Sequence, residues 1–240
     1  MGNPEPQFGW KLFPHLYREG RYLFFLVSLL LLFFFYPFFA GLRFAPRVLG
    51  LLFLAILISG VSSISSSRRA VATATCLAVL AFGGYVGIQL TTGRFFYALT
   101  ASSFALFFAF VTVVVLRHIL STREVTTDTI LGAMCAYLLL GMVWAMVFSL
   151  IEILAPGSFL HGGQSLAASF PEARQPVISS FIYYSFVTLT TLGYGDITPG
   201  SSPAAALSSL EAVTGQLYVA TLIARLVAQH IASGRNTSRD

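Results

Sequence analysis

Charged residues are scarce in this chain, since only 10% of its 240 residues are Asp, Glu, Lys or Arg while 56% are hydrophobic. A soluble domain carries about a quarter charged residues, so the composition excludes that class. The mean hydropathy of +0.80 is typical of an integral membrane protein. The basic residues lie between apolar runs and do not cluster with aromatic residues, which argues against binding of nucleic acid.

Cysteine and catalytic motifs are also nearly absent. The two cysteines, Cys76 and Cys135, both fall in apolar runs, so we expect small buried hydrophobic residues and not a disulfide or a metal pair. The sequence contains no H-E-x-x-H, phosphate loop, nucleophile elbow or histidine–carboxylate cluster. We therefore do not expect an enzyme. A membrane receptor or enzyme is kept as the alternative from a functional class other than transport.

Long apolar runs dominate what is present. A bilayer core of about 30 Å requires roughly 20 apolar residues per helix, and this criterion predicts an all-α membrane protein with six transmembrane helices. The six spans lie near 21–40, 47–66, 70–90, 95–116, 129–153 and 204–231. The apolar stretch VISSFIYYSFVTLT, at 177–190, is too short to cross a membrane and is expected to be a reentrant half-helix.

The distribution of basic residues predicts the orientation. With a cytoplasmic N-terminus, ten of the 14 Lys and Arg residues lie on the cytoplasmic side, as the positive-inside rule requires. We therefore expect a multi-pass protein of the cell membrane with both termini cytoplasmic. Residues 1–20 and 233–240 would form short cytoplasmic segments without a soluble ligand-binding domain, and the loop 154–203 would face outward.

The loop contains the stretch TLTTLGYGD, at 188–196. An ion that enters a pore loses its water, and stacked rings of backbone carbonyls can replace that water. Gly193 and Gly195 stand two places apart, where they allow the alternating backbone angles that turn successive carbonyls to one side. The expected metal ligands are the carbonyls of residues 191–194, namely Thr191, Leu192, Gly193 and Tyr194, with the Thr191 hydroxyl as a further ligand for K⁺.

This stretch, preceded by a half-length apolar helix, resembles the T-x-G-Y-G-D pore motif of the potassium channel family. The resemblance covers about 125–232 and is closest to six-span, bacterial-type subunits with one pore loop. It implies a homotetramer in the lipid bilayer that conducts K⁺ passively and selectively, with K⁺ as the permeant ion. It divides the pore domain into an outer helix at 129–153, a pore helix at 177–190, a filter at 191–196 and an inner helix at 204–231.

The resemblance also implies roles around the filter. Tyr194 would turn away from the pore and pack against aromatic residues of the pore helix, for which Tyr183 and Tyr184 are the candidates. Asp196 would cap the outer mouth. Thr190 and Gly195 would complete the support of the filter, and Leu192 stands where the family more often has valine.

Two carboxylates in the apolar spans have competing interpretations. Glu152 resembles a residue that braces the segment after the filter, although an exposed interfacial acid is the ordinary alternative. A carboxylate at membrane depth usually has a partner or faces water, so Glu211 is expected either to bond a pore-helix hydroxyl, such as Ser185, or to form an ion-binding ring. We favour the structural partner, because Glu211 lies well away from the face of Gln216 on the helix.

The inner helix supplies the expected gate and cavity. By family analogy Gly215 is a hinge, while the alternative is a packing glycine that lets helices approach closely. Gln216, Val219 and Ile223 share one helical face and are expected to line the cavity. Arg225 is expected to extend to the inner membrane interface as an anchor.

Residues 21–120 resemble a voltage-sensor domain without its gating charges. A voltage sensor requires several arginines on its fourth helix, but the fourth span, 95–116, contains no Arg or Lys. We therefore do not expect steep voltage dependence. The alternatives within transport are a weakly selective cation channel of the same fold, which Tyr194 argues against, and a K⁺ transporter, which would need four pore loops in one chain.

Overall fold

The computed structural model describes residues 21–39, 45–64, 68–90, 93–122, 126–166 and 178–237. The expected N-terminal segment 1–20 and the last three residues of the tail lie outside this range. The described helices are α2 (Arg21–Phe39), α3 (Ala45–Ser63), α4 (Arg68–Leu90), α5 (Arg94–Ser121), α6 (Thr127–Leu154), α8 (Ile178–Leu189) and α9 (Ser202–Thr237). The described strands are β1 (Phe159–His161), β2 (Gln164–Ser165) and β3 (Ile197–Pro199).

Four of the helices in the described part of the chain are long and apolar enough to cross a membrane, namely α4, α5, α6 and α9. The remaining long apolar helices, α2 and α3, have 19 residues each, and their described apolar stretches are shorter than a full span. The chain is thus a helical membrane protein. Helix α5 extends to Ser121 instead of ending near 116, which places Arg94 and Arg117 inside the helix, at its two ends.

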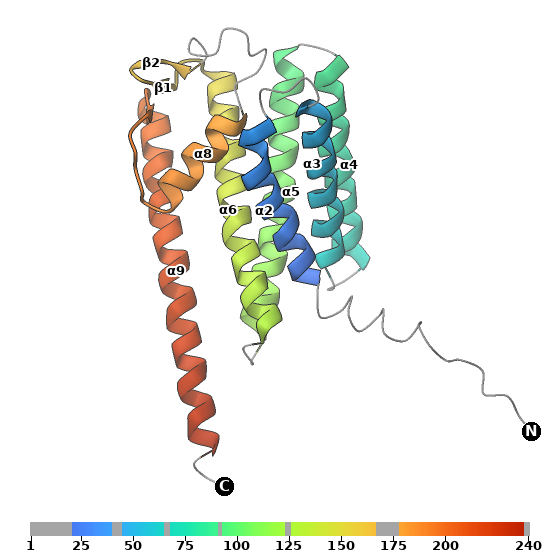
Figure 1. Cartoon of the computed structure of the whole chain (residues 1–240), viewed down its shortest axis with the longest axis vertical. Coiled ribbons are helices and arrows are strands. Elements are labelled where there is room, and N and C mark those ends of the chain that lie inside the picture. The colour runs from blue at the N-terminus through green and yellow to red at the C-terminus, as the bar shows by residue number, and fades with distance from the viewer. Residues whose placement is uncertain are drawn as a thin grey trace, which may run out of the picture.

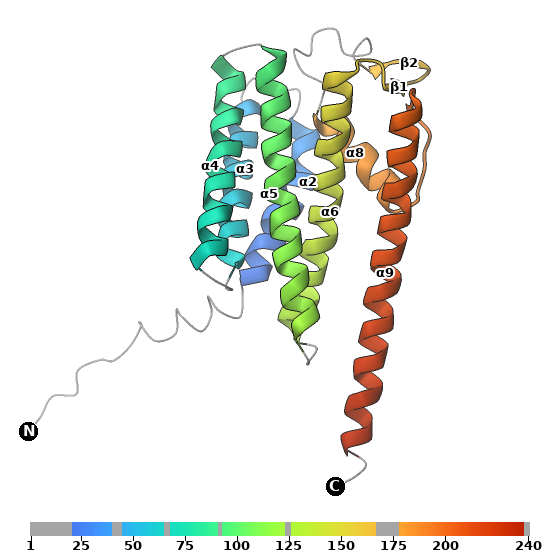
Figure 2. The same ribbon diagram turned by 180° about the vertical axis from the view of Figure 1, so that it is seen from behind.

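The helices form two neighbouring groups (Figure 1). Helices α2 to α5 form a four-helix unit, and α6 packs along α5 and connects that unit to α8 and α9. Figure 2 shows from behind that α9 stands at the edge opposite to α3 and α4. Helices α3 and α5 end, and α4 and α6 begin, at the end of the molecule where α9 ends, whereas the three strands lie at the other end.

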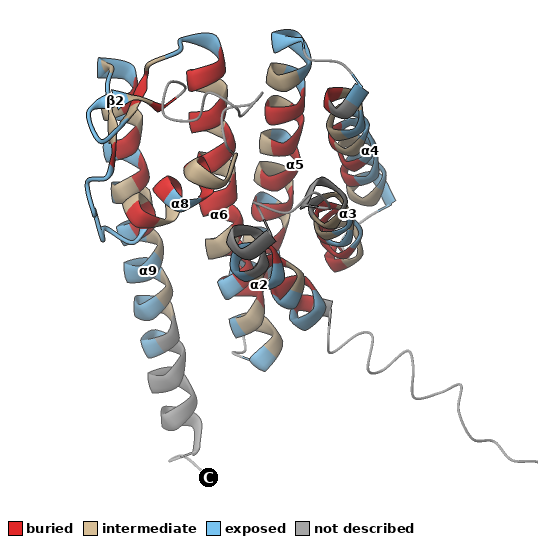
Figure 3. Cartoon of the chain, turned by 45° about the horizontal axis from the view of Figure 1, so that its top comes forward, coloured by how far each residue is buried: buried red, intermediate tan, exposed pale blue. Residues whose placement is uncertain are grey.

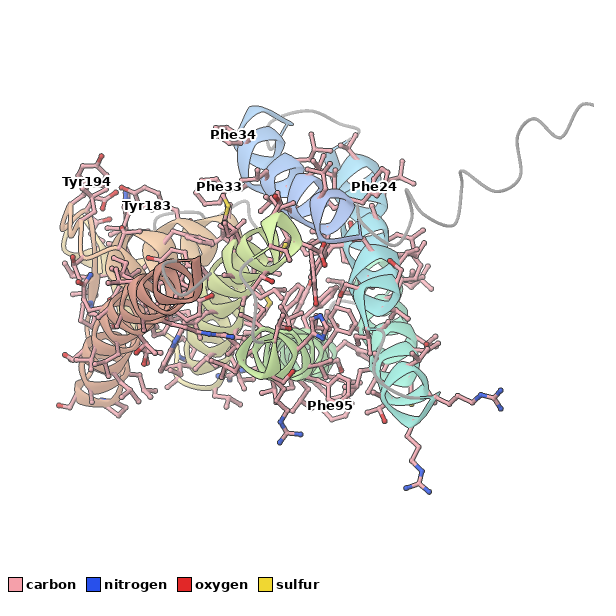
Figure 4. The ribbon with its side chains drawn as sticks, turned by 90° about the horizontal axis from the view of Figure 1, so that it is seen from below. Phe24, Phe33, Phe34, Phe95, Tyr183 and Tyr194 are labelled. Atoms are coloured by element: carbon pink, nitrogen blue, oxygen red, sulfur yellow. The ribbon has the colours of Figure 1, made fainter. Side chains whose placement is uncertain are left out.

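The core of the four-helix unit is aromatic. Phe104 and Phe107 on α5 are buried, and the Phe104 ring lies 4.9 Å from that of Phe53 on α3. Other phenylalanines face outward, with 63% of Phe24 and 73% of Phe95 exposed, and both labelled rings lie on the outside of the bundle in Figure 4. Apolar rings on the outer surface are suited to contact with lipid.

The two cysteines differ in their surroundings. Cys135 is buried and its thiol donates a hydrogen bond of 3.4 Å to the carbonyl of Tyr22. Cys76 is exposed on α4, so the expectation of a buried residue is wrong there. Both lie in apolar runs, but a uniformly apolar helix gives no indication in its sequence of which face packs inside and which meets lipid.

A small antiparallel sheet in the order β2-β1-β3 covers the end of the molecule where α6 ends and α9 begins. The sequence did not predict it. In the register of the sheet, Phe159 lies opposite Pro199 and His161 opposite Ile197, so the chain before α8 pairs with the chain directly after TLTTLGYGD. Buried residues concentrate on α5 and α6, while α9 leaves much of one face exposed (Figure 3).

Candidate functional site

Helix α8 is held in place by aromatic packing on one side and by a close helix contact on another. The rings of Phe148, Phe159, Phe181 and Tyr184 pack with centroid separations of 5.2 to 5.4 Å. Gly141 on α6 allows Phe186 of α8 to approach, because a Cβ at position 141 would lie 2.7 Å from its ring. These contacts fix a 12-residue helix whose C-terminus points at the following glycine-rich stretch.

The backbone after α8 alternates in handedness. Thr191, Gly193 and Gly195 have φ of 59°, 60° and 78°, which is the left-handed region that glycine tolerates and other residues rarely adopt. Every second residue is therefore left-handed. Such alternation turns successive peptide carbonyls to the same side, as expected for Gly193 and Gly195; the left-handed Thr191 is a third such position that the sequence did not predict.

Hydrogen bonds from the backbone amides determine which side the carbonyls face. The amides of Leu192 and Gly193 both donate to the carbonyl of Val187, at 2.9 and 3.3 Å, and therefore point toward α8. In a trans peptide the carbonyl points opposite to the next amide, so the carbonyls of Thr191 and Leu192 point away from α8. Residues 191–195 are exposed in the single chain, which leaves these oxygens free to bind a cation.

Comparison with known families agrees with this geometry. Residues 132–230 match a family whose description is "Ion channel". This part of the chain is an ion channel domain. The match covers less than half of the chain and runs from α6 through α8 to α9, and the family is one of channels and not of enzymes. No curated protein and no solved structure was found to match the chain.

In the channel domain, Tyr194 packs against one of its two expected aromatic partners. The rings of Tyr183 and Tyr194 are parallel within 6° at a centroid distance of 6.5 Å, and the two labelled side chains lie together in Figure 4. The Tyr183 side chain also forms a hydrogen bond with Asp196.

Tyr184 does not support Tyr194, and the expectation for this residue is wrong. Its ring is buried among Phe148 and Phe159, and its hydroxyl lies 2.7 Å from the Oγ of Ser208 on α9. Consecutive residues on a helix point about 100° apart, so only one of the two tyrosines can face the filter. Tyr184 instead joins α8 to Ser208 of α9 and to the C-terminal part of α6 at Phe148.

Glu152 holds the turn between α6 and β1. Its carboxylate is buried and accepts hydrogen bonds from the amides of Gly157 at 2.9 Å and Phe159 at 3.0 Å. The expected direct contact with the segment after the filter is absent from the hydrogen bonds of the described residues. Glu152 acts on β1, and β1 pairs with β3, so its influence on the post-filter segment passes through the sheet.

Arg94 binds the same end of α6 and was not expected to do so. Its Nε donates to the carbonyl of Ile153, and a terminal nitrogen donates to that of Leu154 at 2.8 Å. The last carbonyls of a helix have no partner within the helix and carry partial negative charge, so a guanidinium is a suitable cap. Arg94 thereby joins α5 to the channel domain at this end of α6.

Glu211 forms a buried bridge between α9 and α8. Its side chain is fully buried, and the Ser185 hydroxyl donates to its Oε1. The same Ser185 oxygen lies 2.7 Å from the carbonyl of Gly141 on α6. Glu211 therefore has the pore-helix partner that the sequence suggested, and its burial behind α8 is incompatible with an ion-binding ring in the pore.

Removing the Glu211 side chain is expected to destabilise the channel domain. We expect Glu211→Ala to lower the free energy of unfolding by about 2 kcal/mol, because it removes a buried hydrogen bond and opens a cavity. Glu211→Gln keeps both size and hydrogen bonding and should cost less than about 1 kcal/mol. Thermal unfolding in detergent measures the loss of stability in both variants. Combining Glu211→Ala with Ser185→Ala should give non-additive effects, whereas strict additivity would contradict the bridge.

Gly215 lies where α9 crosses the end of α8. It is buried, and a Cβ there would overlap the carbonyl oxygen of Leu189 and touch the Leu189 side chain. The described α9 is a single helix that continues through this position. The contact supports the packing interpretation of Gly215, and the hinge remains a prediction.

The proposed cavity face of α9 is exposed in the single chain. Gln216 lies close to Thr191, with its Nε2 donating to the hydroxyl of Thr191 at 3.4 Å. Ile223 is 55% exposed on the same side. Val219 also borders a groove of about 270 Å³ shared with α2 and α6, so its side chain lies at the edge of this face.

Arg225 contacts the end of α5, a partner that the sequence did not predict, and its role as an anchor at the membrane interface stays a prediction. Its guanidinium donates a hydrogen bond of 2.6 Å to the carbonyl of Thr122, the C-cap residue of α5. The side chain is half-buried. A main-chain carbonyl at a helix end is a strong acceptor for a cation, so Arg225 joins α9 to the α5–α6 junction.

Proposed function

We propose that this chain is one subunit of a homotetrameric, potassium-selective channel that conducts K⁺ passively. The observation that carries the proposal is the alternating backbone at Thr191, Gly193 and Gly195, with the amides of Leu192 and Gly193 bonded toward α8. This arrangement leaves a series of carbonyl oxygens on the opposite side. Such oxygens can replace the hydration shell of K⁺ at residues 191–194, with the Thr191 hydroxyl as an additional ligand.

Assembly as a tetramer follows from the need to surround the ion. One chain supplies one filter strand, so a ring of carbonyls needs several copies around an axis, and the family resemblance sets their number at four. The exposed apolar side chains on α9 are available for van der Waals packing between copies, which drives the association of helices within a bilayer. They include Leu210, Val213, Leu217 and Val227, each more than 50% exposed in the single chain.

We further propose six membrane spans, with α2 and α3 as the first two and both termini in the cytoplasm. Their 19-residue lengths correspond to about 28 Å of helix, close to the thickness of the bilayer core. Described basic residues support the orientation: Arg68 and Arg69 begin α4 and Arg117 lies near the end of α5, at one end of the molecule, whereas Arg94 begins α5 at the other. The filter then lies near the outer face of the cell membrane.

The four-helix unit lacks the charges that a voltage sensor moves. In α5, Arg94 and Arg117 lie at opposite ends of the helix, and Arg94 is bonded to α6. Between them the helix has no Lys or Arg. We propose that this unit supports the channel domain without sensing voltage steeply.

Reconstitution into planar bilayers tests the function. With K⁺ on one side and Na⁺ on the other, we expect a reversal potential close to the K⁺ equilibrium value and currents without the equivalent of several gating charges per subunit. A reversal potential near zero would contradict K⁺ selectivity and would indicate a weakly selective cation channel of the same fold. Steep voltage dependence would contradict the proposed role of α2 to α5.

A further inference from the structure

An apolar groove lies between α3 and α4, at the opposite side of the molecule from α9 (Figure 1). Its volume is about 720 Å³, and its walls include Leu57, Val61, Val71, Phe82 and Gly83. The two polar side chains on its walls satisfy their own hydroxyls: Ser62 donates to the carbonyl of Ser59 and Thr75 to that of Val71. An apolar ligand in the groove would therefore not bury an unpaired hydroxyl group of Ser62 or Thr75.

The groove has the length of one membrane leaflet. The wall residues of α4 run from Val71 to Gly83, which corresponds to about 18 Å along a helix. Half of a bilayer core is about 15 Å. A groove that runs along a membrane helix for this distance matches one acyl chain of a lipid lying parallel to the helix.

Two positive charges stand at one end of the groove. Arg68 and Arg69 are exposed in the first turn of α4. Arg68 precedes Val71 by three residues and Thr75 by seven, so it continues the same helical face that lines the groove. A phospholipid whose tail occupies the groove would have its phosphate near these guanidinium groups.

We propose that this groove binds one anionic phospholipid, with an acyl chain between α3 and α4 and the headgroup at Arg68 and Arg69. Basic pockets between transmembrane helices recognise anionic headgroups, while the tail is held by burial of its methylene groups. The site is separate from the filter and does not depend on which ion the channel conducts. In the proposed orientation the lipid belongs to the cytoplasmic leaflet.

Lipid retention by the full-length protein tests the site. The purified chain is equilibrated with equal amounts of phosphatidylglycerol and phosphatidylcholine with identical acyl chains, and the bound lipids are counted by native mass spectrometry. We expect one phosphatidylglycerol per subunit to be retained. The double variant Arg68→Gln/Arg69→Gln should lower the preference for phosphatidylglycerol about 25-fold, because each arginine contributes roughly a factor of five.

Two further variants separate this site from general lipid coating. Gly83→Trp places an indole in the groove, where a Cβ at position 83 meets nothing within 4 Å, and it should remove the retained lipid without preventing folding. Arg117→Gln removes an exposed charge near the end of α5, a helix that does not line the groove, and it should leave retention unchanged. Full retention in Gly83→Trp, or an equal loss in Arg117→Gln, would overturn the proposal.

Discussion

Replacing Gly193 with alanine is expected to abolish selective K⁺ current. The residue has a φ of 60°, a left-handed conformation that costs an alanine about 1–2 kcal/mol. In a tetramer four copies carry this cost around one axis, a total of about 4–8 kcal/mol. Rotation of the neighbouring peptide groups would relieve this backbone strain most easily, and it would turn carbonyl oxygens out of the ion path.

Gly163→Ala is the matched control for that experiment. Gly163 has a φ of 82°, its added Cβ meets nothing within 4 Å, and it lies in the β1–β2 turn, outside the filter. Both variants therefore place an alanine in a left-handed conformation. Current and reversal potential in K⁺/Na⁺ bilayers should be lost in Gly193→Ala and kept in Gly163→Ala. Normal K⁺ selectivity in Gly193→Ala would contradict the proposed filter.

The second large effect is expected at Gly215. In Gly215→Ala the new methyl group overlaps the carbonyl oxygen of Leu189, so α9 must move away from the end of α8. Overpacking of this kind costs about 1–3 kcal/mol per site. We expect a lower unfolding temperature in detergent together with a strongly reduced current, because Leu189 is the last residue of α8 and stands two residues before the filter.

Gly83→Ala provides the comparison for Gly215. It makes the same substitution within a helix but at an open position, and alanine is the better helix former, so the unfolding temperature should stay equal or rise. An unchanged unfolding temperature in Gly215→Ala would argue against the packing role. If Gly215→Ala had an unchanged unfolding temperature but a lower open probability, the result would favour the hinge.

Features with local causes could be predicted from the sequence. The half-helix expected at 177–190 is described as Ile178–Leu189, because its apolar run and the following glycines define both its length and its end. Gly193 and Gly195 take the left-handed angles for which glycine is suited. The sequence also suggested the kind of partner that Glu211 has, since a buried carboxylate requires a donor and α8 carries hydroxyl groups on six of its twelve residues.

Features that depend on main-chain partners could not be predicted. Arg94 and Arg225 both donate to carbonyl oxygens at helix ends, and every residue carries such an acceptor, so the sequence does not indicate which one is used. Strands of two or three residues such as β1 and β2 have no detectable alternation. The choice between Tyr183 and Tyr184 likewise depends on the rotation of α8, which its neighbours impose.

The contacts at the end of α6 near Leu154 have a mechanical consequence. Glu152 binds the amides that follow the helix and Arg94 binds its last carbonyls, so we expect this end of α6 to stay fixed if the helix tilts. The helix has 28 residues and is about 42 Å long, so a tilt of about 10° around the fixed end would displace its other end by roughly 7 Å. That far end adjoins the bond between Arg225 and Thr122, where a small rotation would be amplified into separation of α9 from α5.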